Sequence, residues 1–96
     1  MDEITILSAS MTYSKEDGYI GNVQFRFAGH RDAYEMALQS KKGKEWSYGL
    51  FFLDTSGREE EIFAMEDRIE EDDALFEGLI QIAMAALDSS PQQPTI

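Results

Sequence analysis

Residues 19–27 read YIGNVQFRF, and this stretch decides the first half of the fold because its apolar and polar side chains alternate. Strict alternation places every second side chain on the same side of an extended chain, which is the pattern of a half-buried β-strand. The Asp17-Gly18 pair directly before the stretch is a strong hairpin signal. The sequence therefore predicts a strand over residues 19–28 that pairs with the segment upstream of the turn.

Three further segments complete the predicted sheet. Residues 3–13 are rich in β-branched side chains, and their many Ser and Thr residues favour an exposed edge. Residues 33–40 also alternate; Tyr34, Ala37 and Leu38 fit helical spacing as well, but a short segment between turns favours a strand. Residues 45–54 hold the most apolar strand, which is apolar on both faces and so indicates a central or doubly covered position. We expect a four-stranded antiparallel meander.

Two helices are expected after the sheet, over residues 57–71 and 73–88, packed on one of its faces in an α+β fold. Ser56 and Glu59 match a capping box before the first helix, and Asp72 and Asp73 are candidate N-caps of the second. A strand over 61–66 that pairs with the preceding strand is the alternative for the first helix. Residues 1–90 are expected to form one α+β domain, followed by a flexible C-terminal tail over 91–96.

The second predicted helix is unusually apolar. At about 100° per residue, its apolar side chains cover roughly 200° of its circumference, about twice what a helix lying on one sheet needs. Either the first helix covers the other flank or a second subunit does. A homodimer is therefore one expectation, through this helix or through pairing of the first strand's edge.

Composition excludes several classes of site. The chain has 96 residues and no cysteine, which rules out disulfides, zinc–thiolate sites, iron–sulfur clusters and cysteine nucleophiles. The acidic start of the chain is followed by no apolar run typical of a signal peptide, and no stretch reaches the roughly 18 apolar residues of a membrane span. We expect a cytoplasmic protein with no membrane partner.

The net charge of −11 is concentrated in one segment. Residues 1–58 carry 8 acids and 7 bases, whereas residues 59–96 carry 11 acids and a single base, Arg68. Such a segment repels phosphates, so direct binding of nucleic acid is disfavoured. It attracts basic surfaces, and the encounter with them is electrostatically steered.

Few residues have the spacing of a catalytic motif. His30, the single histidine, lies in a turn and is expected to be solvated. No phosphate-binding glycine loop is present, and no cofactor is expected. The carboxylates of 66–73 resemble hard-cation ligands, but without a calcium-loop pattern, so no metal site is assigned; a carboxylate-based metal-dependent enzyme is kept as an alternative.

The acids of the first predicted helix gather on one side of it. Projection at about 100° per residue places Ile62, Met65 and Ile69 in a core stripe, with a band of acids beside it and Phe63 in the middle of that band. An aromatic side chain ringed by charge is typical of an interface anchor with a polar rim. The predicted partner-binding face comprises Glu59, Glu60, Phe63, Glu66, Asp67, Glu70 and Glu71. The alternative is that Phe63 packs under the second helix and the acids only solvate the surface.

In size and charge alone, the chain resembles small acidic α+β inhibitors that shield basic sites, namely immunity proteins against nuclease toxins and DNA mimics. The resemblance implies a non-enzymatic protein-binding module of inhibitor, immunity or adaptor type. Its partner would be a basic protein surface, such as that of a nucleic-acid-binding protein. A small homodimeric accessory protein is the alternative function.

Overall fold

The alternating pattern around residues 19–27 forms the second strand of a four-stranded antiparallel sheet with the order β1-β2-β3-β4. The computed structural model describes residues 3–54 and 57–89. The strands are β1 (Ile4–Ser14), β2 (Gly18–Phe27), β3 (Tyr34–Ser40) and β4 (Ser47–Phe52), and the helices are α1 (Glu59–Glu71) and α2 (Asp73–Ser89). The predicted meander followed by two helices is therefore confirmed, including the strand at 33–40. The predicted tail over 91–96 lies outside the described residues.

The first hairpin turns where the Asp-Gly signal predicts. Gly18 has a φ of +78°, a conformation that side chains rarely adopt, and a Cβ there would lie 2.5 Å from the Ser40 carbonyl oxygen. Ser14 Oγ accepts a hydrogen bond from the Asp17 amide and closes the turn. Glycine is thus required at this point both for the turn and for the close approach of the neighbouring strand.

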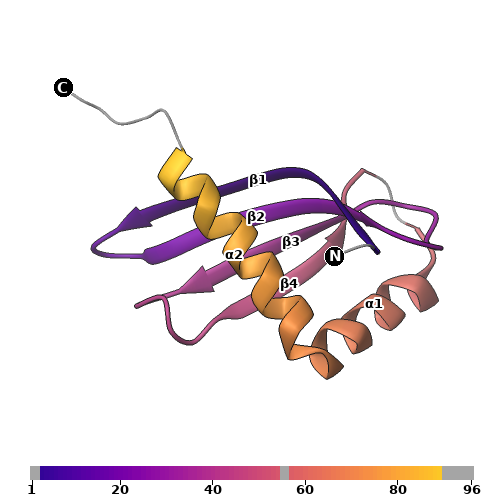
Figure 1. Ribbon diagram of the computed structural model, residues 1–96. Helices are drawn as coiled ribbons and strands as arrows, with labels where there is room; N and C mark the ends of the chain where they lie inside the picture. The colour runs from indigo at the N-terminus through magenta and orange to yellow at the C-terminus, as the bar shows by residue number, and fades with distance from the viewer. Residues whose placement is uncertain (1–2, 55–56, 90–96) are drawn as a thin grey trace.

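Both helices cover the same face of the sheet (Figure 1), which we call the inner face. α2 crosses it diagonally, and α1 lies at one end of it. The fully buried side chains of β2 and β3 on this face include Val23, Phe25, Tyr34 and Met36, and they form one core with Met65 and Ile69 of α1 and Leu79 of α2. The core stripe predicted for α1 is confirmed, and the alternative strand over 61–66 is wrong.

One strand position and one helix start differ from expectation. β4 is an edge strand and not a central one: Leu50 is buried, whereas Phe51 on the opposite side is 54% exposed. Apolarity on both faces of β4 does not mean burial of both. α1 begins at Glu59, two residues after the predicted start at residue 57, and has Arg58 as its N-cap without a side-chain capping bond. Ser56 of the predicted capping box lies outside the described residues. The three glutamates of the first turn favour the positive end of the helix dipole.

α2 has the predicted cap. The Leu75 amide donates a hydrogen bond to Asp72 Oδ1 over 3.1 Å, so Asp72 is the N-cap. The sheet takes up most of the broad apolar surface of α2, and the Phe76 ring packs against Tyr48 of β4 with 5.3 Å between centroids. No large apolar side chain among the described residues of α2 is classed as exposed.

The opposite side of the sheet, which we call the outer face, is not covered by any element within residues 3–54 and 57–89. Alternation from the paired positions places mostly small or uncharged polar side chains there: Thr5, Ser8, Ser10, Thr12, Asn22, Gln24, Ala37, Gln39, Ser47 and Gly49.

Candidate functional site on helix α1

Phe63 is the most exposed large apolar side chain among the described residues, with 56% of its surface accessible. It lies on the solvent-facing side of α1, because Met65 and Ile69 anchor the other side of the helix in the core. Phe63 is therefore exposed, as predicted, and the alternative that it packs under α2 is wrong. Contact of an exposed phenylalanine ring with water is unfavourable, and the exposed ring adds little packing to the core.

All four helical neighbours of Phe63 are acidic. Residues three and four positions away on a helix are its neighbours on the helix surface, and here these are Glu59, Glu60, Glu66 and Asp67. We call these four residues together with Phe63 the acidic face. In the part of the chain that the structure describes, no Lys, Arg or His forms an ion pair with any of the four carboxylates.

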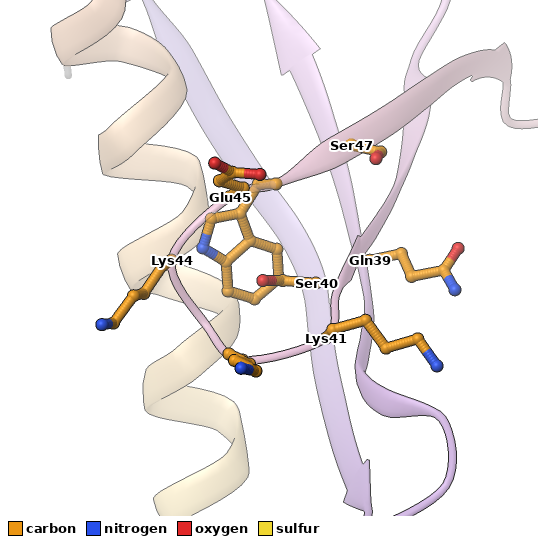
Figure 2. Close-up of a pocket in the computed structure, with 8 residues that line it drawn as sticks. Gln39, Ser40, Lys41, Lys44, Glu45 and Ser47 are labelled. Atoms are coloured by element: carbon orange, nitrogen blue, oxygen red, sulfur yellow. The ribbon is translucent and has the colours of Figure 1, made fainter.

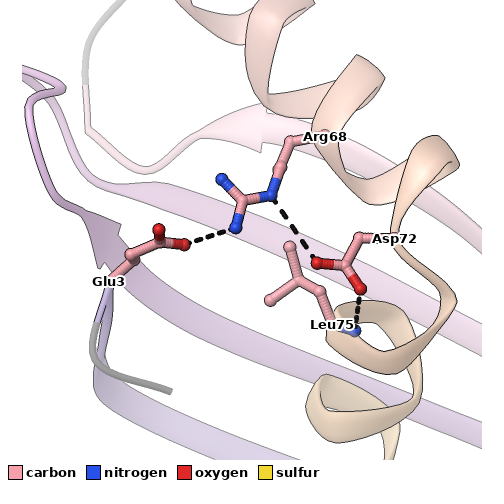
Figure 3. A network of polar contacts seen from close by, with 4 residues as sticks. All are labelled: Glu3, Arg68, Asp72 and Leu75. Carbon is pink, nitrogen blue, oxygen red and sulfur yellow. Dashed lines mark hydrogen bonds and ion pairs between the residues drawn. The ribbon is translucent and has the colours of Figure 1, made fainter.

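The single cation of the helical segment lies on a different flank of α1. Arg68 donates from Nη2 to Glu3 Oε1 over 2.5 Å, and its Nε is 3.7 Å from Asp72 Oδ2 (Figure 3). The guanidinium also lies 5.5 Å from the centre of the Phe27 ring, a cation–π contact. Arg68 thus ties α1 to β2 and to Glu3, directly before β1, and leaves the negative charge of the acidic face uncompensated.

Two of the seven predicted site residues are not helical neighbours of Phe63. Glu70 accepts a hydrogen bond from the Tyr48 hydroxyl over 2.7 Å, which holds this carboxylate against β4. Burial and the bond to Glu70 raise the pKa of Tyr48 above its usual value. Glu71 is exposed in the last turn of α1, eight residues from Phe63. Phe63 is therefore flanked by four carboxylates, not six.

Glu61 has a role that the sequence pattern did not indicate. Its Oε1 accepts a hydrogen bond from the Arg31 amide over 3.1 Å, so the first turn of α1 is tied to the loop between β2 and β3. The partners are 30 residues apart, and helical periodicity carries no signal for such a contact. Glu61 positions the acidic face and does not belong to it.

The same loop holds His30, which is half-buried and not solvated as expected. Its Nδ1 shares a hydrogen bond with the Tyr34 hydroxyl over 2.7 Å, and its ring contacts Phe27 edge-on. Tyr34 is fully buried, and burial, with Glu61 and Asp32 nearby, raises its pKa to about 12. The Tyr34 hydroxyl at the start of β3 and the His30 imidazole in the loop therefore satisfy each other, which is a structural arrangement.

The far end of the sheet carries a basic turn between β3 and β4. Gln39 to Ser47 border a hollow of about 820 Å³ there, with three lysines, Lys41, Lys42 and Lys44, around Trp46. Lys41 and Lys44 extend in opposite directions from the turn (Figure 2), and Lys41 Nζ donates to the Glu16 carbonyl. The lysines do not converge on one point, so this end adds positive charge without forming a defined anion site.

Other kinds of site find no support among residues 3–54 and 57–89. No group of three or more His, Asp or Glu side chains in these residues is arranged to hold a metal ion. No helix in the described ranges is long and apolar enough to span a membrane. No protein-family model, curated protein or solved structure matches the chain.

Proposed function

We propose that this protein is a non-enzymatic, cytoplasmic protein-binding module that uses the acidic face of α1 against a basic surface of another protein. The observation that carries the proposal is an exposed Phe63 whose four helical neighbours are uncompensated carboxylates. An aromatic anchor contributes affinity once it is desolvated by the partner, and the surrounding charges speed the encounter.

The acidic face fits an inhibitor, immunity or adaptor role better than a role in nucleic-acid binding. α1 carries seven acidic residues and one arginine, Arg68, which lies on another flank of the helix. Such a helix repels phosphates. A surface of Lys and Arg that normally binds phosphates is attracted to it for the same reason. The expected partner is therefore a basic, nucleic-acid-binding protein whose binding site the acidic face would shield.

The test is affinity capture at low salt from the cells that make the protein, with matched variants as baits. Glu60→Lys/Asp67→Lys changes the charge beside Phe63, and Glu16→Lys/Asp17→Lys makes the same change in the β1–β2 turn. Capture of the specific partner should fall at least tenfold for the first pair and for Phe63→Ala, and should persist for the second pair. Addition of a short DNA duplex should compete with the bait for the captured protein.

Two results would overturn the proposal. One is that every captured protein binds the Glu60/Asp67 and Glu16/Asp17 variants equally well. The other is a complex that is indifferent to salt between 0.05 and 0.3 M, since charge pairs across a solvated rim are screened in this range.

A further inference from the structure

The outer face of the sheet differs in charge from the rest of the molecule. Its strand positions carry one cation, Arg26, and one anion, Glu35, within a chain whose net charge is −11. Glu35 already accepts a hydrogen bond from the Asn22 side-chain amide over 2.6 Å. A neutral face cannot attract a charged partner over a distance, but it is the surface on which two highly acidic molecules can meet with the least repulsion.

Large apolar side chains are exposed on this face at Ile20 of β2, which is 44% exposed, and on the two edge strands. Phe51 on β4 is 54% exposed, and Leu7 is 46% exposed at the bulge in β1. The Phe51 ring lies against the sheet over Gly49, where a Cβ would be only 3.0 Å from the ring. The ring therefore presents its free side outward, in the plane that a stacked sheet would contact.

The register places Phe51 in the row that ends at the bulge of β1, next to Leu7. Ser8, which directly follows the bulged residue Leu7, pairs with Gln24. Gln24 pairs with Glu35, and Glu35 pairs with Phe51. A two-fold axis parallel to the strands exchanges the two edges of the sheet. It therefore brings Phe51 of one copy over Leu7 of the partner subunit, and the same contact forms a second time. The face is thus complementary to itself.

Size and electrostatics also fit a second copy. Strands about 4.8 Å apart with about 3.3 Å per residue give the four-stranded face a projected area of roughly 500 Å² in each copy. Two copies would therefore bury roughly 1,000 Å² in total, close to the lower end of stable interfaces. Stacked sheets lie about 10 Å apart, and each helical layer lies about another 10 Å beyond its sheet, so the two acidic helices would be about 30 Å apart. That separation exceeds the Debye length of about 10 Å at 0.1 M salt.

We infer that the outer face of the sheet is the interface of a homodimer in which two sheets stack face to face and Phe51 packs on Leu7 of the partner subunit. This dimer leaves the acidic face of α1 on the outside of each subunit. One assembly would then present two acidic faces, and neither surface requires the other.

The experiment is sedimentation velocity of the full chain from 5 to 300 µM in 0.15 M NaCl. The wild type should shift from monomer towards dimer within this range. Phe51→Glu should raise the dimer dissociation constant at least tenfold, because it buries a carboxylate in the interface. Phe63→Glu makes the same substitution on the other exposed phenylalanine and should leave the dimer unchanged. Circular dichroism confirms that each variant is folded.

A second variant keeps the test decisive if Phe51→Glu does not fold. Ala37→Glu introduces charge and bulk near the middle of the outer face and should have the same effect. A wild type that stays monomeric up to 300 µM would overturn the inference. A dimer that both variants leave intact would also overturn it, and would point to pairing through the edge of β1 or through α2.

Discussion

The acidic face of α1 and the outer face of the sheet each expose a phenylalanine to a similar extent, but in opposite electrostatic surroundings. Phe63 lies among four unpaired carboxylates, whereas Phe51 lies over Gly49 on a face with no net charge. Charge acts over a Debye length and selects partners of opposite sign, while a neutral apolar contact acts only at contact distance. The same side chain type thus suits a foreign basic partner in one place and a second copy of the chain in the other.

The strongest way to sharpen this comparison is to separate folding from recognition on α1. Ile69 is 2% exposed, and Ile69→Ala should lower the free energy of unfolding by about 2–4 kcal/mol because it leaves a cavity in the core. Phe63→Ala should change it by less than about 0.5 kcal/mol. Urea denaturation measures both. A loss of more than 1 kcal/mol for Phe63→Ala would mean that Phe63 supports the fold rather than a partner.

Alkaline pH should weaken the attachment of α1, on which the acidic face depends. The pKa of Tyr34 is raised to about 12 in the folded protein, whereas an unfolded tyrosine ionises near 10. The unfolded state therefore loses its proton first, so stability is fully present below pH 10 and falls as the pH rises towards 12. The loss is roughly 2 kcal/mol over that interval, and the raised pKa of Tyr48 acts in the same direction.

Urea midpoints at pH 9, 10 and 11 measure this dependence. Tyr34→Phe removes one titrating hydroxyl and should reduce the slope of stability against pH, leaving the contribution of Tyr48. The variant starts from a lower stability because His30 loses its partner. A wild type whose stability is constant from pH 9 to 11 would contradict the prediction.

Salt should weaken binding of a basic partner to the acidic face but should not weaken dimerisation through the outer face. Binding of the basic partner should weaken about tenfold between 0.05 and 0.3 M NaCl, which is about 1.4 kcal/mol, because the charges of the acidic face become screened. Dimerisation should stay constant or strengthen over the same range, since salt screens the repulsion between two chains of charge −11. Titration calorimetry and sedimentation measure the two constants, and a parallel loss of both would remove the distinction between the surfaces.

The smallest expected effect concerns the boundary of the acidic face. Tyr48→Phe removes the hydrogen bond to Glu70 and should cost about 1 kcal/mol of unfolding free energy. Tyr13→Phe is the control, because the Tyr13 hydroxyl has no hydrogen bond within the described residues. Thermal unfolding compares the two variants. Equal midpoints would show that Glu70 is not held by Tyr48 and belongs with the four acids around Phe63.

Much of the fold was readable because its signals are local. The alternation over 19–27, the Asp17-Gly18 turn and the helical spacing of Met65 and Ile69 all report on neighbours a few residues away. The prediction of a central or doubly covered β4 was wrong. Apolar residues on both faces of a strand do not show whether another layer covers the second face. The helix start was misplaced for a related reason: a capping motif competes with the contacts that dock the first turn, such as Glu61 on Arg31.

The sequence by itself determined the order of the elements, the concentration of charge in residues 59–77 and the presence of Phe63 among acids, since composition and periodicity are properties of neighbouring residues. Only the tertiary structure decided that Arg68 turns away to Glu3 and that Glu70 is held by Tyr48. It also decided that one face of the sheet remains uncovered. These facts depend on contacts between segments far apart in the chain, which local patterns do not encode.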